Sequence, residues 1–473
     1  MNRVTAQDFY DYTKCPHRVY LNRFGDLREK LPQADFLNLL FESALLHEQE
    51  CIKSLPYRSP EGDTPEGQAM STLRLMEEGA ERIYQGVLIA GNGSGRPDIL
   101  EKSGGHSRFG DYLYKPVDIK SGSGYEERED RTLRVDYGMQ LLHYAKLLQE
   151  IQGIFPSEGQ ILNKKAERVV YPLDDFVALY GQVHPEIANL VNGAKTDEPV
   201  RCQSCTLCQW WGHCEPILVK GKDVSLLPEI GRARRSELIK VGVKSIPDVM
   251  SIDFRKVKLK GIGPKISESL TRHAEVSLSG TMKVLQKPTL RDARFKVYFD
   301  FEDDPTQELI YLCGLLFEPD WNGRAYCGLV GPDEQGEGRM WADFQEICSA
   351  IQSEDFIVLH YSAYEKTKMS QLEAKYGASK KQAVEHFRAQ MVDLFPLVRQ
   401  TAVLPTRGYG LKHVAPLLGF KYSAKDAGGA QSIVWFQEYQ KDPANAEILD
   451  KILTYNKDDC VAMKVVYDWL RSL

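Results

Sequence analysis

The stretch FKVYFDFEDDP, residues 295–305, opens the last third of the chain and has the alternating pattern of a β-strand. Side chains two apart in a strand point to the same face, so Asp300 and Glu302 should project together. The run ELIYLCGLLF, residues 308–317, also alternates and predicts a neighbouring antiparallel strand. The last third is therefore expected to contain a sheet with two carboxylates on one face.

Further carboxylates follow on other predicted elements. The stretch DFIVLHYSAYEKTKM, residues 355–369, predicts a strand leading into a helix, with Glu365 near the junction. Asp393, in MVDLFPLVRQ, is a competing third carboxylate, although its position after a helix suits a supporting role. The run LTYNKDDCVAMKVVYDWL predicts a strongly periodic helix on which Tyr455 and Asp459 share a face, four residues apart.

These motifs resemble the DEDD exonucleases of the RNase H-like fold, most closely the YprB-like domain of RecB-family nucleases. The resemblance implies a 3′–5′ exonuclease in which two Mg²⁺ or Mn²⁺ ions are held by Asp300, Glu302, Glu365 and Asp459. It also implies that Tyr455 orients the attacking water. The second motif departs from the family's asparagine, three residues, aromatic and aspartate, since His360, three residues, Tyr364 and Glu365 stand there. Glutamate is one methylene longer, which changes the reach of this carboxylate.

Four of the ten cysteines fall within RCQSCTLCQWWGHC, residues 201–214. Clustered thiolates are the donors that zinc or an iron–sulfur cluster requires. No second cluster follows, but Cys15 stands alone near the start. A lone early cysteine with a late group of three resembles the iron–sulfur staple of RecB-like nucleases, including AddB and the CRISPR-associated RecB-like exonucleases. The resemblance implies a [4Fe-4S] cluster on Cys15, Cys205, Cys208 and Cys214. Zinc remains the alternative, and Cys202 is an alternate ligand.

Between these cysteines lie GRPDIL, with Asp98, and YKPVDIKSG, with Asp118 and Lys120. In a strand, Asp118 and Lys120 would project into one site. Phosphodiester hydrolysis needs carboxylates to hold Mg²⁺ and a nearby lysine to orient or deprotonate water. The arrangement resembles the PD-(D/E)xK nuclease motif.

The same resemblance adds residues on two helices. RecB-like nucleases place a metal-binding histidine on a helix before the aspartate, and His47 stands at the matching position. From the residues alone, a histidine on an apolar helix face is more often a core residue. Gln140 and Tyr144, four apart on a later helix, would lie near the scissile strand; otherwise they are the polar edge of that helix.

The middle of the chain carries the basic charge. Between Pro228 and Arg272 stand eleven Lys and Arg against five Asp and Glu, while the whole chain has a formal charge of -6. Two stretches here each have a glycine-containing turn before a helix, which resembles a tandem helix-hairpin-helix module. The resemblance implies phosphate binding without base specificity, through Gly231, Arg232, Gly261, Gly263 and Lys265. In the first hairpin, Glu229 replaces the first glycine.

The 473 residues predict an α/β protein of several domains. We expect a restriction-endonuclease-like α/β nuclease core with its iron–sulfur staple over residues 1–217. A small all-α helix-hairpin-helix module would follow over 218–285, and an RNase H-like α/β exonuclease domain over 290–473. The segment LQKPTLRDA, residues 285–293, has the composition of a linker.

The function expected from these parts is a Mg²⁺-dependent nuclease with two hydrolytic sites, acting on single-stranded DNA or DNA ends. The alternatives are an RNA exonuclease and a nucleic-acid-binding scaffold with one or both sites inactive. No G-x-x-x-x-G-K-[ST] stretch occurs, so any unwinding would come from a partner helicase. The sequence shows no apolar leader or membrane span, which predicts a cytoplasmic protein without a membrane partner. Repair, defence and CRISPR spacer processing all remain open as pathways.

Overall fold

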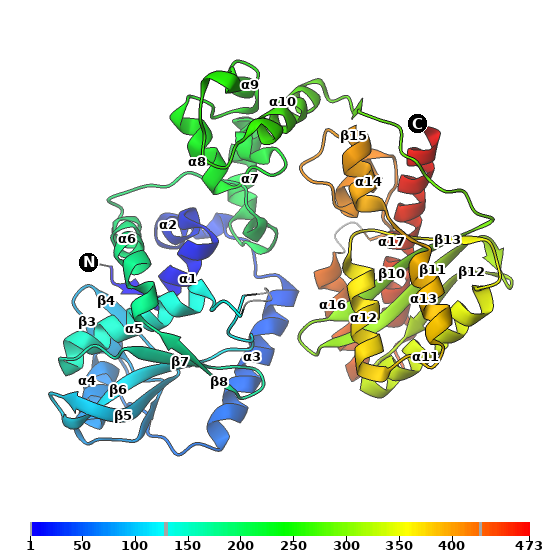
Figure 1. The fold of residues 1–473 in the computed structure, drawn as a ribbon. Helices are drawn as coiled ribbons and strands as arrows, with labels where there is room; N and C mark the ends of the chain where they lie inside the picture. Colours follow the sequence, from blue (N-terminus) through cyan, green and yellow to red (C-terminus); the bar gives the residue numbers. More distant parts are fainter. Residues whose placement is uncertain (1, 127–130, 425–427) are drawn as a thin grey trace. The chain divides into compact units, whose positions relative to one another are not determined.

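The computed structural model describes residues 2–126, 131–424 and 428–473. The chain divides into two compact units, Met1–Ile217 and Leu218–Leu473 (Figure 1). Within the described residues, no helix combines the length and the apolar character that crossing a bilayer would require.

The first unit is built on a five-stranded sheet in the order β2-β5-β6-β7-β8. Its strands are β2 (Arg82–Tyr84), β5 (Ile99–Ser107), β6 (Gly110–Ile119), β7 (Glu158–Leu162) and β8 (Arg168–Pro172). Only the β6–β7 pair is parallel, and α5 (Val135–Gln152) connects these two strands. Leu141, Leu142 and Leu148 of α5 are fully buried, so this helix forms much of the core under the sheet.

A second, three-stranded sheet has the order β1-β4-β3, formed by β1 (Val4–Thr5), β4 (Gly93–Gly95) and β3 (Leu88–Ala90). Besides α5, the unit contains α1 (Ala6–Lys14), α2 (Pro16–Phe24), α3 (Asp35–Lys53), α4 (Pro65–Glu77) and α6 (Asp174–Val191), and α7 (Trp211–Lys220) runs across the boundary at Ile217. The two ends of the unit meet, because Trp210 Nε1 donates to Asn22 Oδ1 at 2.9 Å. The backbone N–H of Leu31 also donates to Gln209 O at 2.8 Å.

The second unit begins with short helices in the basic segment. They are α8 (Arg232–Lys240), α9 (Ile246–Val249) and α10 (Pro264–Ser279). Arg235 and Asp223 form a buried ion pair, with Nη2 and Oδ2 2.7 Å apart, that holds α8 in place. β9 (Lys283–Val284) then pairs antiparallel with β15 (Ala402–Val403), so this segment is hydrogen-bonded to the last third of the chain.

The large sheet of the second unit has the order β12-β11-β10-β13-β14. Its strands are β10 (Phe295–Asp304), β11 (Leu309–Trp321), β12 (Arg324–Val330), β13 (Phe356–His360) and β14 (Met391–Asp393). β10 pairs antiparallel with β11, which confirms the expected neighbour, and parallel with β13.

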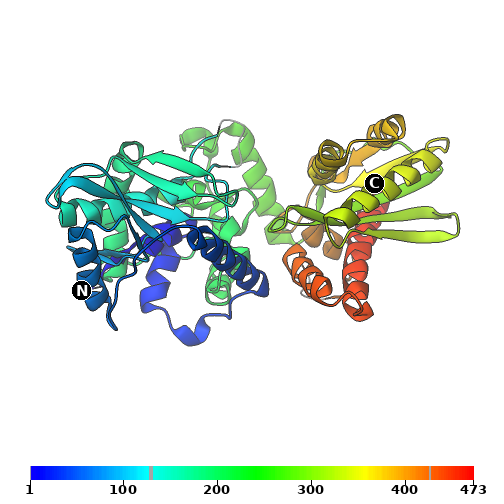
Figure 2. The same ribbon diagram turned by 90° about the horizontal axis from the view of Figure 1, so that it is seen from below.

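Helices cover both faces of this sheet (Figures 1 and 2). Phe299 and Phe301 of β10 pack against Phe344 of α11 (Glu334–Ile351), in a core that also includes α12 (Tyr364–Tyr376) and α13 (Lys381–Ala389). Tyr298 contacts Tyr467 of α17 (Ala446–Ser472) on the opposite face, where α14 (Leu394–Thr401) and α15 (Leu411–Leu417) also pack. Strand alternation therefore directs Asp300 and Glu302 toward α17.

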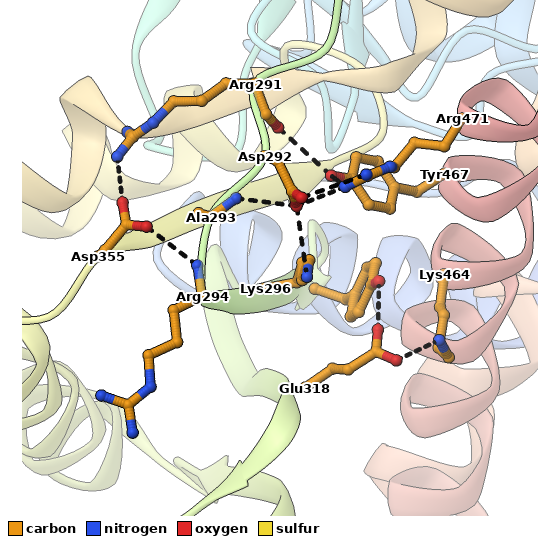
Figure 3. A network of polar contacts seen from close by, with 11 residues as sticks. Arg291, Asp292, Ala293, Arg294, Lys296, Glu318, Asp355, Lys464, Tyr467 and Arg471 are labelled. Atoms are coloured by element: carbon orange, nitrogen blue, oxygen red, sulfur yellow. Dashed lines mark hydrogen bonds and ion pairs between the residues drawn. The ribbon is translucent and has the colours of Figure 1, made fainter.

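The segment before β10 is bound to the part of the unit that contains the large sheet by ion pairs and hydrogen bonds (Figure 3). Arg291 contacts Asp355 at 2.5 Å, and the Arg294 backbone N–H donates to the same carboxylate at 3.1 Å. Asp292 pairs with Arg471 of α17 and with Lys296, the latter at 3.5 Å. The stretch that the sequence predicts as a linker is therefore docked onto the domain at its carboxyl end.

Candidate active sites

Three carboxylates converge in the second unit. One oxygen each of Asp300, Glu302 and Asp459 lies within 4.8 Å of the others, and no other group of three ligand atoms comes this close in the described part of the chain. The first two stand on β10 and the third on α17, so strand alternation and one helix face build the group together. Oxygen donors at this spacing suit Mg²⁺ or Mn²⁺.

Burial raises the pKa of all three carboxyl groups, well above the usual range for Asp300 and Glu302. The second cause for both strand residues is repulsion from a neighbouring carboxylate. Concentrated, poorly solvated negative charge is the condition under which a divalent cation binds strongly. The residues present therefore fit the metal that the sequence motifs imply.

Asn456 fixes the position of Asp300, because its Nδ2 donates to Asp300 Oδ2 at 2.8 Å. Its own carbonyl accepts a hydrogen bond of 2.9 Å from the Tyr326 hydroxyl. Asp300 stands opposite Gly314 in the β10–β11 ladder, and a Cβ on Gly314 would lie 1.6 Å from Asn456 Oδ1. The glycine is thus required by the side chain that positions the carboxylate.

Glu365, the third predicted carboxylate, lies apart from the tight group. It is buried, and its Oε2 is 3.2 Å from Nδ1 of the fully buried His360. Burial raises the pKa of Glu365, which the contact with His360 partly offsets. The Glu365 charge in turn raises the pKa of Asp300, so the two residues are neighbours.

Asp393, the competing carboxylate, has a structural role. Its Oδ1 accepts hydrogen bonds from the backbone of Ser362 at 2.8 Å and of Phe395 at 2.9 Å. The second bond caps the first turn of α14, and the first holds the loop before Glu365. Ser362 has φ of 90°, a conformation strained for a residue with a side chain.

Tyr455 is buried one helical turn before Asp459 on α17. Burial raises its pKa, and the nearby carboxylates of Glu302 and Asp459 raise it further. The hydroxyl therefore stays protonated beside the carboxylate group, where it can donate or accept a hydrogen bond but not supply a charge. The Tyr455 ring also lies beside the Lys412 ammonium, at 4.1 Å from its centroid.

Lys412 was missed in the sequence. Its Nζ is 3.1 Å from Asp459 Oδ1, and the residue lies in the first turn of α15, far from the carboxylates in the chain. A single lysine in GLKHVAPLL carries no spacing signal toward Asp300, Glu302 or Asp459. Only the packing of α15 against α17 brings it to them.

In the first unit, Asp98, Asp118 and Lys120 meet at the ends of β5 and β6. Lys120 Nζ is 2.9 Å from Asp118 Oδ2, and Asp98 Oδ2 accepts from the Ile119 backbone N–H at 2.7 Å. Burial, then repulsion from Asp118, raises the pKa of Asp98 to about 8. Burial alone would lower the pKa of Lys120, but the attraction of Asp118 and Asp98 raises it above its usual value.

Glu48 extends this site and is a second residue that sequence reasoning missed. Its Oε1 accepts from Tyr84 Oη at 2.9 Å and from Gln85 Nε2 at 2.7 Å, and the same Nε2 lies 3.2 Å from Asp98 Oδ1. The predicted ligand His47 is adjacent in the chain, with its ring 3.6 Å from the Cys51 sulfur. An acidic residue directly after the histidine was the only available signal.

Gln140 and Tyr144 lie buried on α5, as a pair one turn apart. Burial, with a further contribution from Asp118 and Asp98, raises the pKa of Tyr144 well above its usual value. Tyr144 is thus a neighbour of the carboxylates. Gln140 Nε2 contacts the Ala6 carbonyl at 3.5 Å instead.

Five cysteines line one cavity of the first unit. They are Cys15, Cys202, Cys205, Cys208 and Cys214. Cys202 and Cys205 have their sulfurs 3.7 Å apart, but no three cysteine sulfurs among the described residues lie within 4.8 Å of one another. The predicted alternate ligand Cys202 therefore lines the same cavity as the four predicted ligands and lies next to Cys205.

The two hairpins of the basic segment have the same backbone conformation, but one has a glutamate where the other has a glycine. Gly231 and Gly263 each precede a helix as its N-cap residue, and two positions earlier Glu229 and Gly261 have φ of 66° and 73°. This left-handed conformation normally favours glycine. Lys265 lies in the first turn of α10, and Arg232 begins α8.

Glu229 is engaged within its own unit. Its carboxylate forms an ion pair with Arg399 of α14, and its carbonyl accepts from Arg234 Nη1 at 2.7 Å. Arg234 also donates through Nε to the Gly261 carbonyl at 3.0 Å. His273 Nε2 lies 3.0 Å from Tyr409 Oη, which adds a further contact between this segment and the last third.

Comparison with known families agrees with the fold of the last third. A family model described as the RNase_H superfamily matches residues 297–471. The second unit thus contains an RNase H-like domain, whose superfamily consists in general of metal-dependent nucleic-acid hydrolases. A search of the curated proteins finds no match to the chain.

Proposed function

We propose that the protein is a Mg²⁺- or Mn²⁺-dependent nuclease with two hydrolytic sites, whose RNase H-like domain removes nucleotides from 3′ ends. The observation that carries the proposal is the convergence of Asp300, Glu302 and Asp459 on a domain of the RNase H superfamily. When bound there, the metal would neutralise phosphate charge and activate water. Single-stranded DNA or DNA ends are the proposed substrates.

The chain's own groups divide the work in the exonuclease site. Asp300 and Glu302 would bind metal from β10, and Asp459 from α17. Tyr455, kept protonated beside them, would orient the attacking water through its hydroxyl. Glu365 would assist as the fourth carboxylate, held by His360.

In the first unit we propose a PD-(D/E)xK-type site. Asp98 and Asp118 would bind metal, with His47 or Glu48 completing the set, and Lys120 Nζ would position water beside Asp118. Gln140 and Tyr144 would line the path of the strand. This site would cut single-stranded DNA from an end or internally.

The test uses single-stranded DNA and RNA labelled at the 5′ or the 3′ end, with Mg²⁺. Wild type is compared with Lys120→Ala, Asp300→Ala and the double variant, with the exposed changes Lys165→Ala and Asp320→Ala as matched controls. Each site variant should remove a different product pattern, and the double variant all products. Cleavage by the double variant as by wild type would contradict both site assignments. The DNA and RNA arms decide the substrate.

A nucleic-acid-binding scaffold is the second candidate. The observation that favours it is Glu365, which pairs with His360 rather than joining the tight carboxylate group. A wild type that binds labelled strands in a salt-dependent way, without any metal-dependent cleavage, would select this function.

We further propose a [4Fe-4S] cluster on Cys15, Cys205, Cys208 and Cys214. A tetrahedral zinc site, with Zn–S bonds of about 2.3 Å, would hold its four sulfurs about 3.8 Å apart. Cys202 and Cys205 have their sulfurs 3.7 Å apart, while no three cysteine sulfurs of the described residues lie within 4.8 Å of one another, so the metal content decides between cluster and zinc. Anaerobically purified protein should be brown with stoichiometric iron and sulfide; Cys15→Ser should remove the colour, and Cys327→Ser should retain it. If Cys202→Ser loses the colour and Cys205→Ser keeps it, Cys202 and not Cys205 is the cluster ligand.

For the basic segment we propose binding to phosphates without base specificity. The second hairpin, with Gly261, Gly263 and Lys265, would carry most of the contact, because Glu229 of the first hairpin pairs with Arg399. Gly231 and Arg232 would contribute less. Lys265→Glu should weaken binding of every sequence alike and reduce its salt dependence. Unwinding of duplex substrates would come from a partner helicase.

A further inference from the structure

Lys412 places a positive charge inside the carboxylate group. Its side chain is 35% exposed, yet the Nζ atom itself is buried. The ammonium lies 3.1 Å from Asp459 Oδ1, and 4.0 and 4.1 Å from the ring centroids of Tyr422 and Tyr455. One carboxylate and two aromatic faces thus surround a single buried cation.

The influence of this cation extends beyond Asp459. The Lys412 charge also opposes the burial that raises the pKa of Asp300 and of Glu302. The same three oxygens are the ones that converge within 4.8 Å. In the structure, therefore, the lysine supplies the positive charge that the acidic group requires.

We propose that Lys412 is a counter-cation that competes with divalent metal for Asp459. When a strand binds, the lysine side chain would move so that its ammonium contacts a phosphate of that strand. The inference rests on the proposed function of this site and adds a regulation to it: metal would bind weakly until a phosphate is present. Lys412 would thus act twice: on the metal through Asp459, and on the substrate through the phosphate.

Three physical arguments support the exchange. A Mg²⁺ ion at Asp459 would lie within a few Å of the ammonium, and like charges at that distance repel strongly where water is scarce. Aromatic faces stabilise a cation without fixing it by directional bonds, so Tyr422 and Tyr455 allow it to move. Lysine has a flexible four-carbon stem and three donors, which suits it to follow a phosphate oxygen.

The test measures Mn²⁺ binding to the full chain by calorimetry, without nucleic acid. Asp98→Ala is present in every protein so that the first unit contributes little. Lys412→Met should bind Mn²⁺ about tenfold or more tightly than the parent, whereas Lys412→Arg, which keeps the charge, should stay within about threefold. Lys457→Met, an exposed lysine two residues before Asp459, is the matched control and should change the affinity less than twofold.

A second arm adds thymidine 5′-monophosphate as the phosphate probe. The nucleotide should strengthen Mn²⁺ binding in the parent and do so markedly less in Lys412→Met. Unchanged or weaker Mn²⁺ binding by Lys412→Met, with a parent-like circular dichroism spectrum, would overturn the competition. An equal gain from the nucleotide in both proteins would overturn the transfer to phosphate. If neither the parent nor Lys412→Met binds Mn²⁺ at this site, with or without the nucleotide, the proposed function itself is refuted.

Discussion

The two acidic sites of this chain each contain a lysine paired with a carboxylate, at 2.9 Å for Lys120 and Asp118 and at 3.1 Å for Lys412 and Asp459. In the first site the pair comes from neighbouring positions of one strand end. In the second, the lysine lies in the first turn of a short helix and the carboxylate stands on a separate long helix. The lysine–carboxylate pair thus forms between residues close in the sequence at the first site, and between packed helices at the second.

The difference follows from how many carboxylates converge. In the first site a backbone N–H also binds Asp98, so part of the negative charge is satisfied by the strand itself. In the second, three carboxylates crowd within 4.8 Å and burial raises the pKa of each. The second site therefore has more uncompensated negative charge, which the proposed movement of Lys412 would balance. Lys120 instead stays beside Asp118, two residues away in the chain.

The largest test of this contrast removes one charge from each site without changing its shape. Glu302→Gln should lower the exonuclease rate by about a thousandfold, because preorganised charge in a buried site carries most of the rate acceleration. Asp118→Asn should do the same to the other product pattern only. Single-turnover assays with end-labelled strands separate the two, and loss of both patterns from one change would mean that the sites are not independent.

The next largest effects are expected at two glycines, each of which leaves space for a side chain of an active site. Gly314→Ala should displace Asn456, loosen Asp300 and lower the exonuclease rate by about a hundredfold, with about 1–3 kcal/mol lost in stability from overpacking. Gly95→Ala would meet the Tyr144 ring at 2.6 Å and should affect only the first site. Activity and thermal melting are the measurements. Gly104→Ala, with open space around its Cβ, is the control and should change neither.

A smaller change should distinguish two neighbours on α3. Glu48→Gln is expected to raise the Mg²⁺ concentration needed for first-site cleavage by about tenfold, since Glu48 shares Gln85 with Asp98. His47→Ala should have a lesser effect. Metal titrations of the first-site products measure both, and a dominant effect of His47→Ala would restore the histidine as the principal ligand on this helix.

The smallest expected effect is a pH dependence of stability in the first unit. Asp98 has its pKa raised to about 8, so between its usual range and pH 8 the folded state holds a proton that the unfolded state has lost. Stability without metal should therefore fall as pH rises from 5 to 8, by about 1–4 kcal/mol. Hydrogen exchange in β5 and β6 of the full chain measures this loss. Asp98→Asn should lack the slope, and the same slope in both proteins would assign it to another group.

The sequence predicted much of the fold where its signals were local. Alternation in residues 295–305 gave the strand and its acidic face, and the helical period placed Tyr455 one turn from Asp459. The spacing of Asp118 and Lys120 predicted that they meet, and they do. These elements were readable because strands repeat every two residues and helices every 3.6.

The residues that were missed have no such period. Lys412, Glu48 and Asn456 reach their partners across long stretches of chain, and Gly314 matters only because Asn456 lies against it. Cys202, by contrast, was already predicted as an alternate ligand, and the structure places it in the same cavity as Cys15.

By itself, the sequence determined the strand over residues 295–305, its antiparallel neighbour and the helix of Tyr455 and Asp459, and which of their faces carry charge, because these depend on repeats of a few residues. The tertiary structure alone decided which cation enters the carboxylate group and that Glu365 pairs with His360. It also decided that Glu229 binds Arg399 instead of leaving its hairpin free. The reason is physical: these contacts arise when separate elements are packed together, and the energy of burying a charge is fixed by its neighbours in space.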